Sequence, residues 1–232
     1  MLRFFKDFIS LFYPEVCLGC GEGLAEAEEF ICTTCLYKLP KTNYHLQAEN
    51  PMYKVFYGRA EIIAAAAYCY YSKGSMVQDL VHEIKYNGKK ELGVAIGKWY
   101  GAELKQSAGF DKTDVIIPVP LHPKKLKKRG YNQSACFAEG LSDMLQVPLL
   151  ANGIKRIKDT ETQTNKSRFE RWNNVKDVFE VDNKEELANK HVLLVDDIVT
   201  TGATMEACIH ALHSVPVGSV SVASIGYVTD EL

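Results

Sequence analysis

The stretch from His191 to Thr204, HVLLVDDIVTTGAT, restricts the fold of this chain more than any other. It begins with a mostly apolar run, continues with two adjacent aspartates, and ends in threonines, glycine and alanine. A short apolar run that stops at polar residues is typical of a buried strand, and small residues after it are typical of a loop. The pattern predicts a strand over 191–195, a loop that begins with both aspartates, and a helix over 203–213.

The same order of elements recurs along the chain. Short apolar runs typical of strands occur at 114–120 (DVIIPVP) and 219–228 (SVSVASIGYV). Apolar residues at helical spacing predict a helix from Met76 to the Asn87-Gly88 pair, and further helices over 91–106 and 131–145. Strands that alternate with helices predict an α/β fold in which helices cover both faces of a parallel sheet.

Two segments are not assigned to one kind of element. Residues 61–71 (EIIAAAAYCYY) are apolar and aromatic, and their four alanines fit a buried strand or a helix equally well. Residues 41–58 are polar and irregular, and we expect them to connect two parts of the chain.

Composition excludes several classes of protein. The chain has 232 residues, of which 47% are hydrophobic and 24% charged, as expected for one globular domain with a small appendage. Its net charge of −2 argues against a surface coated with positive charge for nucleic acid. No apolar run reaches the ~18–20 residues of a membrane helix, and residues 1–14 lack the features of a signal peptide. We therefore expect a short packing helix over 1–13, no membrane insertion and a cytoplasmic protein.

Four of the seven cysteines form the pattern C-x2-C-x11-C-x2-C, namely Cys17, Cys20, Cys32 and Cys35. Two such pairs can supply four thiolates to one tetrahedral zinc ion, and the glycines beside the first pair suit a tight turn. With four protein ligands no coordination position stays open, so the zinc is expected to be structural. A redox pair or buried free thiols are the minority alternatives. Cys69, Cys136 and Cys208 lie in apolar surroundings and are expected in the core.

The aspartates and the loop after them suit particular ligands. In parallel sheets, ligands bind beyond the carboxyl ends of the strands, where Asp196 and Asp197 are expected. A loop that enters a helix offers unpaired N–H groups and the positive end of the helix dipole to an anion. Gly202 allows a close approach of the backbone to a phosphate, and carboxylates suit hydroxyls or magnesium. A strand-end turn capped by threonines is the plainer alternative, and the string GxxxxGK[ST] of P-loop proteins is absent.

Two basic segments accompany this motif. Residues 124–129 hold four lysines and an arginine beside the end of the strand at 114–120, and we expect them to form a loop. Such a loop is either simply solvated or holds an anion such as pyrophosphate. Residues 155–179 carry seven basic and four acidic residues, and they fit a surface hairpin or a mobile loop equally well.

The string VLLVDDIVTTGAT resembles the phosphoribosyl-pyrophosphate (PRPP) motif of type I phosphoribosyltransferases. The resemblance implies that the loop at Thr200, Thr201, Gly202, Ala203 and Thr204 holds the 5-phosphate, and that Asp196 and Asp197 face the ribose hydroxyls. In that family the loop after the first core strand binds pyrophosphate, and a flexible hood closes over it, with magnesium bound to PRPP. These positions correspond here to Leu121, His122, Lys124, Arg129, Arg156, Gln163, Arg168 and Arg171. The expected catalytic residues are Asp196, Asp197, Arg156, Arg168 and Arg171.

Several motifs together resemble the ComF family of bacterial competence-related proteins. They are the four cysteines, KYNGKKEL (85–92), PVPLHPKKLKKRGYNQS (118–134), TQTNKSRFERWNNVKDVF (162–179) and VDDIVTTGAT (195–204). The resemblance covers nearly the whole chain and implies a zinc module over 1–50, a phosphoribosyltransferase-like domain over 51–232, and a cytoplasmic role in natural transformation. Partners expected from it are PRPP, and single-stranded DNA or a DNA-uptake helicase or recombination protein.

Two hypotheses for the function stay open. The chain is either a phosphoribosyltransferase, or a module that senses PRPP or binds single-stranded DNA without catalysis. The basic segments could follow a phosphate backbone, and Tyr131, Phe169 and Trp172 are near enough in sequence to stack on bases. The sequence identifies no acceptor pocket and no base that would activate an acceptor.

Overall fold

The computed structural model describes residues 15–157, 178–182 and 184–229. The main sheet has four strands in the order β1-β6-β5-β2, and every neighbouring pair is parallel. The strands are β1 (Ala64–Tyr70), β2 (Val115–Pro118), β5 (His191–Val199) and β6 (Ser219–Tyr227). Almost every residue of these strands is buried, which explains their apolar runs and confirms the predicted α/β fold.

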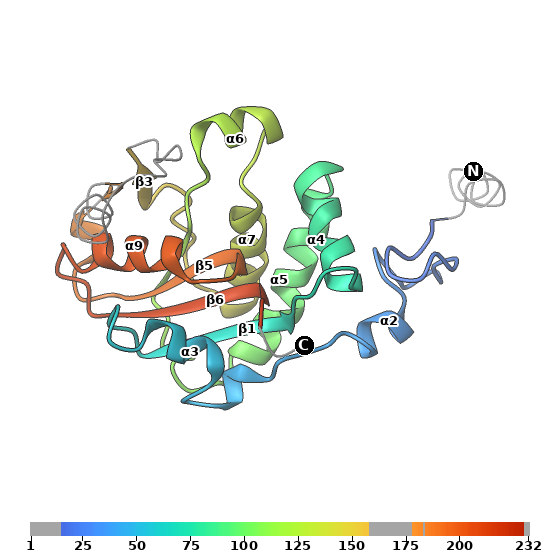
Figure 1. The fold of residues 1–232 in the computed structure, drawn as a ribbon, viewed down its shortest axis with the longest axis horizontal. Helices are drawn as coiled ribbons and strands as arrows, with labels where there is room; N and C mark the ends of the chain where they lie inside the picture. Colours follow the sequence, from blue (N-terminus) through green and yellow to red (C-terminus); the bar gives the residue numbers. More distant parts are fainter. Residues whose placement is uncertain (1–14, 158–177, 183, 230–232) are drawn as a thin grey trace.

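Helices cover both faces of this sheet (Figure 1). On one side lie α4 (Met76–Tyr86), α5 (Lys90–Leu104) and α7 (Gln133–Leu145), and on the other lie α3 (Pro51–Phe56) and α9 (Ala203–Leu212). The smaller elements are α2 (Thr33–Tyr37), α6 (Pro123–Arg129), the 3-10 turns η1 (Tyr44–Leu46) and η2 (Lys184–Leu187), and a hairpin of β3 (Ile154–Arg156) with β4 (Phe179–Val181). No helix among the described residues is long and apolar enough to cross a membrane.

Helices α5 and α7 pack with their backbones almost in contact. A Cβ atom added to Gly97 would lie 2.2 Å from the carbonyl oxygen of Phe137, and one added to Gly140 would lie 2.0 Å from that of Val94. Only glycine leaves room for this approach. Of the two helices, α7 packs against β2 and β5, the two strands that lead to the candidate site.

Three local expectations differ from the structure. The expected basic loop is helix α6, because the His122 side chain accepts a hydrogen bond from the Lys124 N–H and Gly130 ends the helix with a φ of 78°. The expected connector over 41–58 contains η1 and α3, because Tyr44, Met52 and Phe56 are buried. Strand β5 continues through both aspartates to Val199, since Asp196, Ile198 and Val199 remain paired with β6.

One open alternative has an answer, and one expectation is confirmed. Residues 61–71 contain a strand, β1, and Cys69 within it is buried, as are Cys136 and Cys208. The expected helix over 1–13 lies outside the described residues.

Strand β1 is the outer strand of the main sheet, and the segment that precedes α3 is hydrogen-bonded to its outer side. The Tyr70 N–H donates to the Pro40 carbonyl at 2.8 Å, and the Thr42 N–H donates to the Tyr68 carbonyl at 3.0 Å. The side-chain amide of Asn50 donates to three carbonyls, including that of Ala65 at 2.7 Å. Residues 40–50 are therefore tied to the sheet by backbone hydrogen bonds at 40–42 and by the Asn50 side chain.

Candidate functional site

A cavity of about 190 Å³ opens at the carboxyl ends of β2 and β5. We call it the acidic-pair cavity, because Asp196 and Asp197 lie in its wall. Its other lining residues are Lys85, Val119, Pro120, Leu121, His122, Lys125, Arg129, Asn132, Gln133, Ser134, Arg156 and Thr204. Seven residues expected at the site from the sequence therefore meet here, namely Leu121, His122, Arg129, Arg156, Asp196, Asp197 and Thr204.

Asp196 is held by hydrogen bonds from two other groups. The Ser134 hydroxyl and the Asp197 N–H both donate to its Oδ1 at 2.8 Å. Burial, and then the neighbouring charge of Asp197, raise the pKa of the Asp196 carboxyl from 3.8 to about 7. The pair therefore carries less than its full negative charge near neutral pH.

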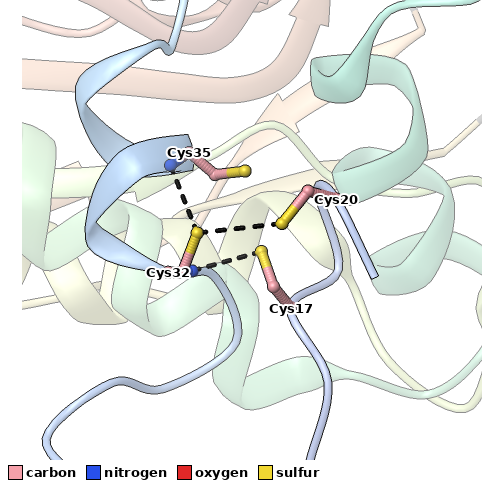
Figure 2. Close-up of side chains that lie close together, drawn as sticks. All are labelled: Cys17, Cys20, Cys32 and Cys35. Atoms are coloured by element: carbon pink, nitrogen blue, oxygen red, sulfur yellow. Dashed lines mark hydrogen bonds between the residues drawn. The ribbon is translucent and has the colours of Figure 1, made fainter. Parts of the chain in front are cut away.

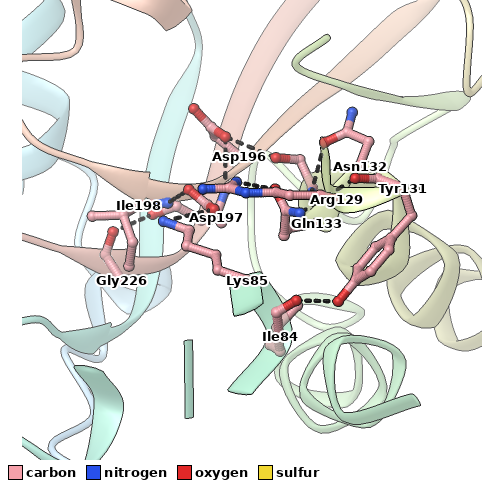
Figure 3. Close-up of polar contacts among 12 residues, drawn as sticks. Ile84, Lys85, Arg129, Tyr131, Asn132, Gln133, Asp196, Asp197, Ile198 and Gly226 are labelled. Carbon is pink, nitrogen blue, oxygen red and sulfur yellow. Dashed lines mark hydrogen bonds and ion pairs between the residues drawn. The ribbon is translucent and has the colours of Figure 1, made fainter. Parts of the chain in front are cut away.

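Asp197 is paired with a lysine from a distant part of the chain (Figure 3). The Lys85 Nζ at the end of α4 lies 2.8 Å from Asp197 Oδ2, and both side chains are mostly buried. Losing either partner of such a pair would leave a buried charge without compensation, so the contact fixes both side chains in the cavity wall.

The loop after β5 leads into the N-terminus of α9. Gly202 precedes the helix with a φ of 70°, a conformation that glycine adopts without strain, and no side chain caps the helix there. A smaller cavity of about 50 Å³ lies against this loop and shares Asp196 and Thr204 with the acidic-pair cavity. Thr200, Thr201, Gly202 and Ala203 line this smaller cavity. The helix dipole and the N–H groups of the first turn favour an anion at such a place.

Arg59 holds this loop from the segment after α3. Its guanidinium donates to the Thr201 carbonyl at 3.1 Å and to the Val55 carbonyl at 3.0 Å, and it forms an ion pair with Glu206 of α9. Arg59 therefore links the loop to both α9 and α3.

The basic residues of α6 do not all face the cavity. Lys125 and Arg129 line it, whereas Lys124 does not. Arg129 donates to Gln133 Oε1 at 2.6 Å, and its guanidinium lies 5.2 Å above the ring of Tyr86. No residue of α6 is buried.

Arg156 approaches the cavity from the hairpin of β3 and β4. Its guanidinium lies 5.6 Å from the centre of the Phe179 ring. The other residues expected in the hood, Gln163, Arg168 and Arg171, lie outside the described residues, as do Phe169 and Trp172.

The four cysteines of the N-terminal pattern converge (Figure 2). The sulfur atoms of Cys17, Cys20, Cys32 and Cys35 all lie within 4.8 Å of one another. The N–H groups of Cys32 and Gly19 donate to the Cys17 sulfur at 3.2 and 3.3 Å, as they would to a thiolate.

The thiol pKa values differ within this cluster. Burial raises the pKa of Cys17, but backbone N–H donors outweigh it and hold the pKa at about 6. Burial, and then the neighbouring sulfurs, raise the pKa of Cys35 to about 12. Four sulfurs at this spacing could hold a metal ion, and a cation among them would favour the thiolate form of each.

Four supporting residues were missed by the reasoning from sequence. Lys85, Arg59, Ser134 and Asn132 come from segments far from the acidic pair in the chain. Three of them had only a positional signal: Lys85 opens KYNGKKEL, and Asn132 and Ser134 lie in RGYNQS, at the start of α7. Arg59 lies just past the expected connector and had no signal.

Residues 132–228 match the phosphoribosyl transferase domain family. That range begins with Asn132 and includes Ser134, Arg156, both aspartates and the whole loop before α9. Among solved structures, a purine phosphoribosyltransferase from Pyrococcus horikoshii is similar with a TM-score of 0.38 and 21% identity, covering 60% of this chain and 84% of that one.

Three curated proteins are similar in sequence. Competence protein F of Haemophilus influenzae is 38% identical over 121 residues, which are 52% of this chain and 53% of that protein, so the match spans about half of that relative. DNA utilization protein YhgH of Escherichia coli O6:H1 is 27% identical over 193 residues, or 82% of this chain and 80% of that protein. Competence protein ComFC of Bacillus subtilis is 23% identical over 192 residues, with 82% and 75% covered.

Proposed function

Because the chain belongs to the ComF family of competence-related proteins and carries a phosphoribosyl transferase domain, we propose that it binds PRPP with magnesium in the acidic-pair cavity. The observation that carries the proposal is that two neighbouring cavities share Asp196 and Thr204 in their walls. One holds the carboxylates and the other lies at an uncapped helix N-terminus. A phosphate and a ribose with free hydroxyls would fill the two together.

Each part of PRPP has candidate partners. The loop Thr200–Thr204 receives the 5-phosphate, and Asp196 and Asp197 accept hydrogen bonds from the ribose hydroxyls. Lys125, Arg129 and Arg156 supply positive charge for the pyrophosphate, together with the backbone at Leu121 and His122. Lys124 belongs to the same helix but does not line the cavity, so we give it a weaker, long-range role.

The residues around the cavity fit magnesium as well. Carboxylate oxygens are hard donors of the kind that magnesium prefers, and two carboxylates share one wall here. When bound with PRPP, magnesium would neutralise part of the pyrophosphate charge. The chain's own cations would stabilise the charge that grows on pyrophosphate as the bond to the anomeric carbon breaks. Arg168 and Arg171 are proposed to join them.

We place zinc in the four-cysteine cluster, where it would be structural. The Cys17 sulfur already accepts two backbone N–H bonds, which is how a protein stabilises a thiolate ligand. Metal analysis of freshly purified, reduced protein should find stoichiometric zinc. Protein without zinc would contradict the assignment.

For the cellular role, we propose that the protein acts in natural transformation, on DNA that enters the cytoplasm. The names of the relatives, two competence proteins and a DNA utilization protein, support this role. Single-stranded DNA, or a helicase or recombination protein of the uptake pathway, is the proposed partner.

The binding of PRPP is tested by replacing Asp197 with asparagine in the full chain. The change removes one carboxylate charge and keeps the shape, and we expect PRPP affinity in the presence of magnesium to fall at least tenfold in isothermal titration. Asp143→Asn is the matched control, because Asp143 is an exposed aspartate paired with Lys98. Unchanged PRPP binding by Asp197→Asn would refute the proposed site.

A non-catalytic module is the second candidate, and the exposure of α6 favours it. Lys124, Lys125, Lys127 and Lys128 lie on a helix with no buried residue, so they are accessible to a phosphate backbone. If PRPP binds but no acceptor in a panel of bases and amines releases pyrophosphate, a sensor or binding module is favoured. Single-stranded DNA binding that weakens steeply with salt, and is lost when these lysines become glutamines, would assign α6 to DNA.

A further inference from the structure

Lys85 opens the KYNGKKEL segment (85–92) and has no part in the contacts proposed for PRPP. It is the penultimate residue of α4, and its side chain lines the acidic-pair cavity. Its Nζ lies 2.8 Å from Asp197 Oδ2, and the exposed fractions of the two side chains are 21% for the lysine and 15% for the aspartate. The pair is therefore largely shielded from water, and each charge depends on the other for compensation.

The last turn of α4 is held in place on either side of Lys85. The Tyr131 hydroxyl donates to the Ile84 carbonyl, and the Arg129 guanidinium lies 5.2 Å from the centre of the Tyr86 ring. Both partners belong to the end of α6 and the residues just after it. Figure 3 shows the Lys85 side chain reaching the acidic pair from this turn. These contacts fix the backbone on both sides of the lysine, so its ammonium group is directed into the cavity wall.

The Asp197 carboxylate has a partner at each oxygen. Its Oδ1 accepts a hydrogen bond from the Ile198 N–H at 2.7 Å, and its Oδ2 is paired with Lys85. A magnesium ion lies about 2.0–2.1 Å from a carboxylate oxygen that binds it. An ion at Oδ2 would therefore be within about 5 Å of the Lys85 nitrogen, where two positive charges repel each other strongly in a partly buried site. Lys85 thus occupies the place that a free metal ion would take.

The charges around the acidic-pair cavity favour an anion over a free cation. Four basic side chains line the cavity, against two carboxylates: Lys85, Lys125, Arg129 and Arg156. A bare divalent cation that enters alone therefore meets a wall with an excess of positive charge. Magnesium that arrives on PRPP is different, because the phosphate oxygens supply metal ligands and leave the complex with a net negative charge.

We propose that Lys85 is a tethered counter-ion that keeps free metal ions away from the acidic pair, so that magnesium enters the cavity only together with PRPP. This role rests on the proposed binding of PRPP in the same cavity. In the free protein the ammonium group neutralises Asp197 and leaves the cavity attractive to an anion. When PRPP binds, its ribose hydroxyls donate to carboxylate lone pairs that neither Lys85 nor the Ile198 N–H uses, so the ion pair persists.

Metal binding without PRPP is measured on Lys85→Gln in the full chain. We expect the parent protein to bind manganese, a spectroscopic substitute for magnesium, only weakly in electron paramagnetic resonance titrations. Lys85→Gln leaves Asp197 without a counter-ion and should bind manganese about tenfold more tightly or more. Lys85→Met, which has a similar length and no charge, is measured in parallel, whereas Lys85→Arg keeps the charge and should behave like the parent. Lys98→Gln is the matched control, because Lys98 is an exposed lysine paired with Asp143.

PRPP titrated in buffer without divalent ions should respond in the opposite direction. Its affinity should fall about tenfold or more in Lys85→Gln, because the uncompensated charge of Asp197 repels the anion. A variant that had merely lost its fold would bind both ligands less tightly, so the opposite signs identify a counter-ion. In the double variant Lys85→Gln, Asp197→Asn neither charge of the pair remains, and the gain in manganese affinity should disappear.

The outcomes separate the role of Lys85 from the proposed function. Manganese binding by the parent as tight as by Lys85→Gln would overturn it, and so would a gain that persists in the double variant, since the metal would then lie elsewhere. A loss of PRPP affinity without a gain in manganese affinity would also overturn it, because Lys85 would then only support the cavity or contact PRPP. Failure of the parent to bind PRPP with magnesium would refute the proposed function instead, and the manganese comparison would still measure what Lys85 excludes.

Discussion

At the scale of single residues, the acidic pair shows how the chain holds two carboxylates in one wall. Two neighbouring negative charges in a partly buried site repel each other, and the protein reduces this repulsion in two ways. It raises the pKa of Asp196 to about 7, and it pairs Asp197 with Lys85. A ligand with hydroxyl groups or a cation would relieve the same repulsion, so the cost of the pair in the free protein favours binding.

The raised pKa of Asp196 predicts a pH-dependent stability. The pKa of the Asp196 carboxyl is higher in the folded chain than its ordinary value of 3.8. The stability that this carboxyl contributes is therefore complete below about pH 4, and it is lost as the pH rises through about 7. Asp196→Asn removes this dependence and keeps an oxygen that accepts from Ser134. The free energy of unfolding of the variant, relative to the parent protein, should rise by about 1–3 kcal/mol between pH 4 and pH 8.

Urea unfolding at both pH values, without ligand, measures this difference. Asp143→Asn should show no comparable change, because Asp143 is exposed and pairs with an exposed lysine. A variant and a parent protein whose stabilities differ by the same amount at pH 4 and pH 8 would refute the argument.

At the scale of elements, the packing of α5 on α7 predicts a sharp cost for one added methyl group. A Cβ atom on Gly140 would meet the Val94 carbonyl and the Gly97 Cα, which are backbone atoms and cannot swing away. Gly140→Ala should therefore lower the free energy of unfolding by about 1–3 kcal/mol or more, measured by thermal and urea denaturation. Gly23→Ala is the matched control, because nothing lies within 4 Å of a Cβ atom there. Equal stability of the two variants would contradict the packing.

Elements with a local signal could be predicted from the sequence. The order of strands and helices and the four-cysteine cluster both follow from patterns within short segments. Helix α6 could have been predicted too, from His122 and Pro123 at its start and Gly130 at its end. The density of lysines favoured a loop instead, although repulsion among exposed charges costs little beside proper capping.

Contacts between distant segments could not be predicted. Lys85 and Asp197 are more than a hundred residues apart, as are Arg59 and Thr201. Their pairing depends on where α4 and α3 lie against the sheet, and no pattern along one chain encodes that placement.

At the scale of the whole molecule, the four-cysteine cluster rests against the domain that carries the site. A Cβ atom on Gly19 would lie 2.6 Å from the Met76 sulfur and 3.0 Å from that of Cys35. The cluster therefore touches the first residue of α4, the helix that ends near Lys85. An ordered cluster supports the start of that helix.

Loss of the metal should consequently be felt beyond the cluster. Cys32→Ser should abolish zinc binding and lower the melting temperature, because metal binding supplies folding free energy to a segment too small for its own core. Zinc content and circular dichroism during heating measure the two effects. Cys136→Ala, which removes a cysteine outside the cluster, should keep the zinc. A Cys32→Ser protein with full zinc content would contradict the assignment of the ligands.

Residues 40–42 give the molecule a further property. A chain shortened to residues 51–232 would keep every strand of the main sheet but lose the partners of Tyr68 and Tyr70 on the outer side of β1. A chain of residues 39–232 would keep them. We expect the shorter chain to form soluble oligomers or precipitate in light scattering, and the longer one to remain monodisperse. Equal behaviour of the two would refute this expectation.

The reason is that an uncovered strand offers its backbone to any other strand it meets. In β1 that backbone carries a run of four alanines, whose small side chains would do little to keep a second copy away. The segment that leads from the cysteines to α3 thus protects the protein against self-association. A protein that lost this segment to proteolysis would keep the residues of the acidic-pair cavity and become prone to aggregate.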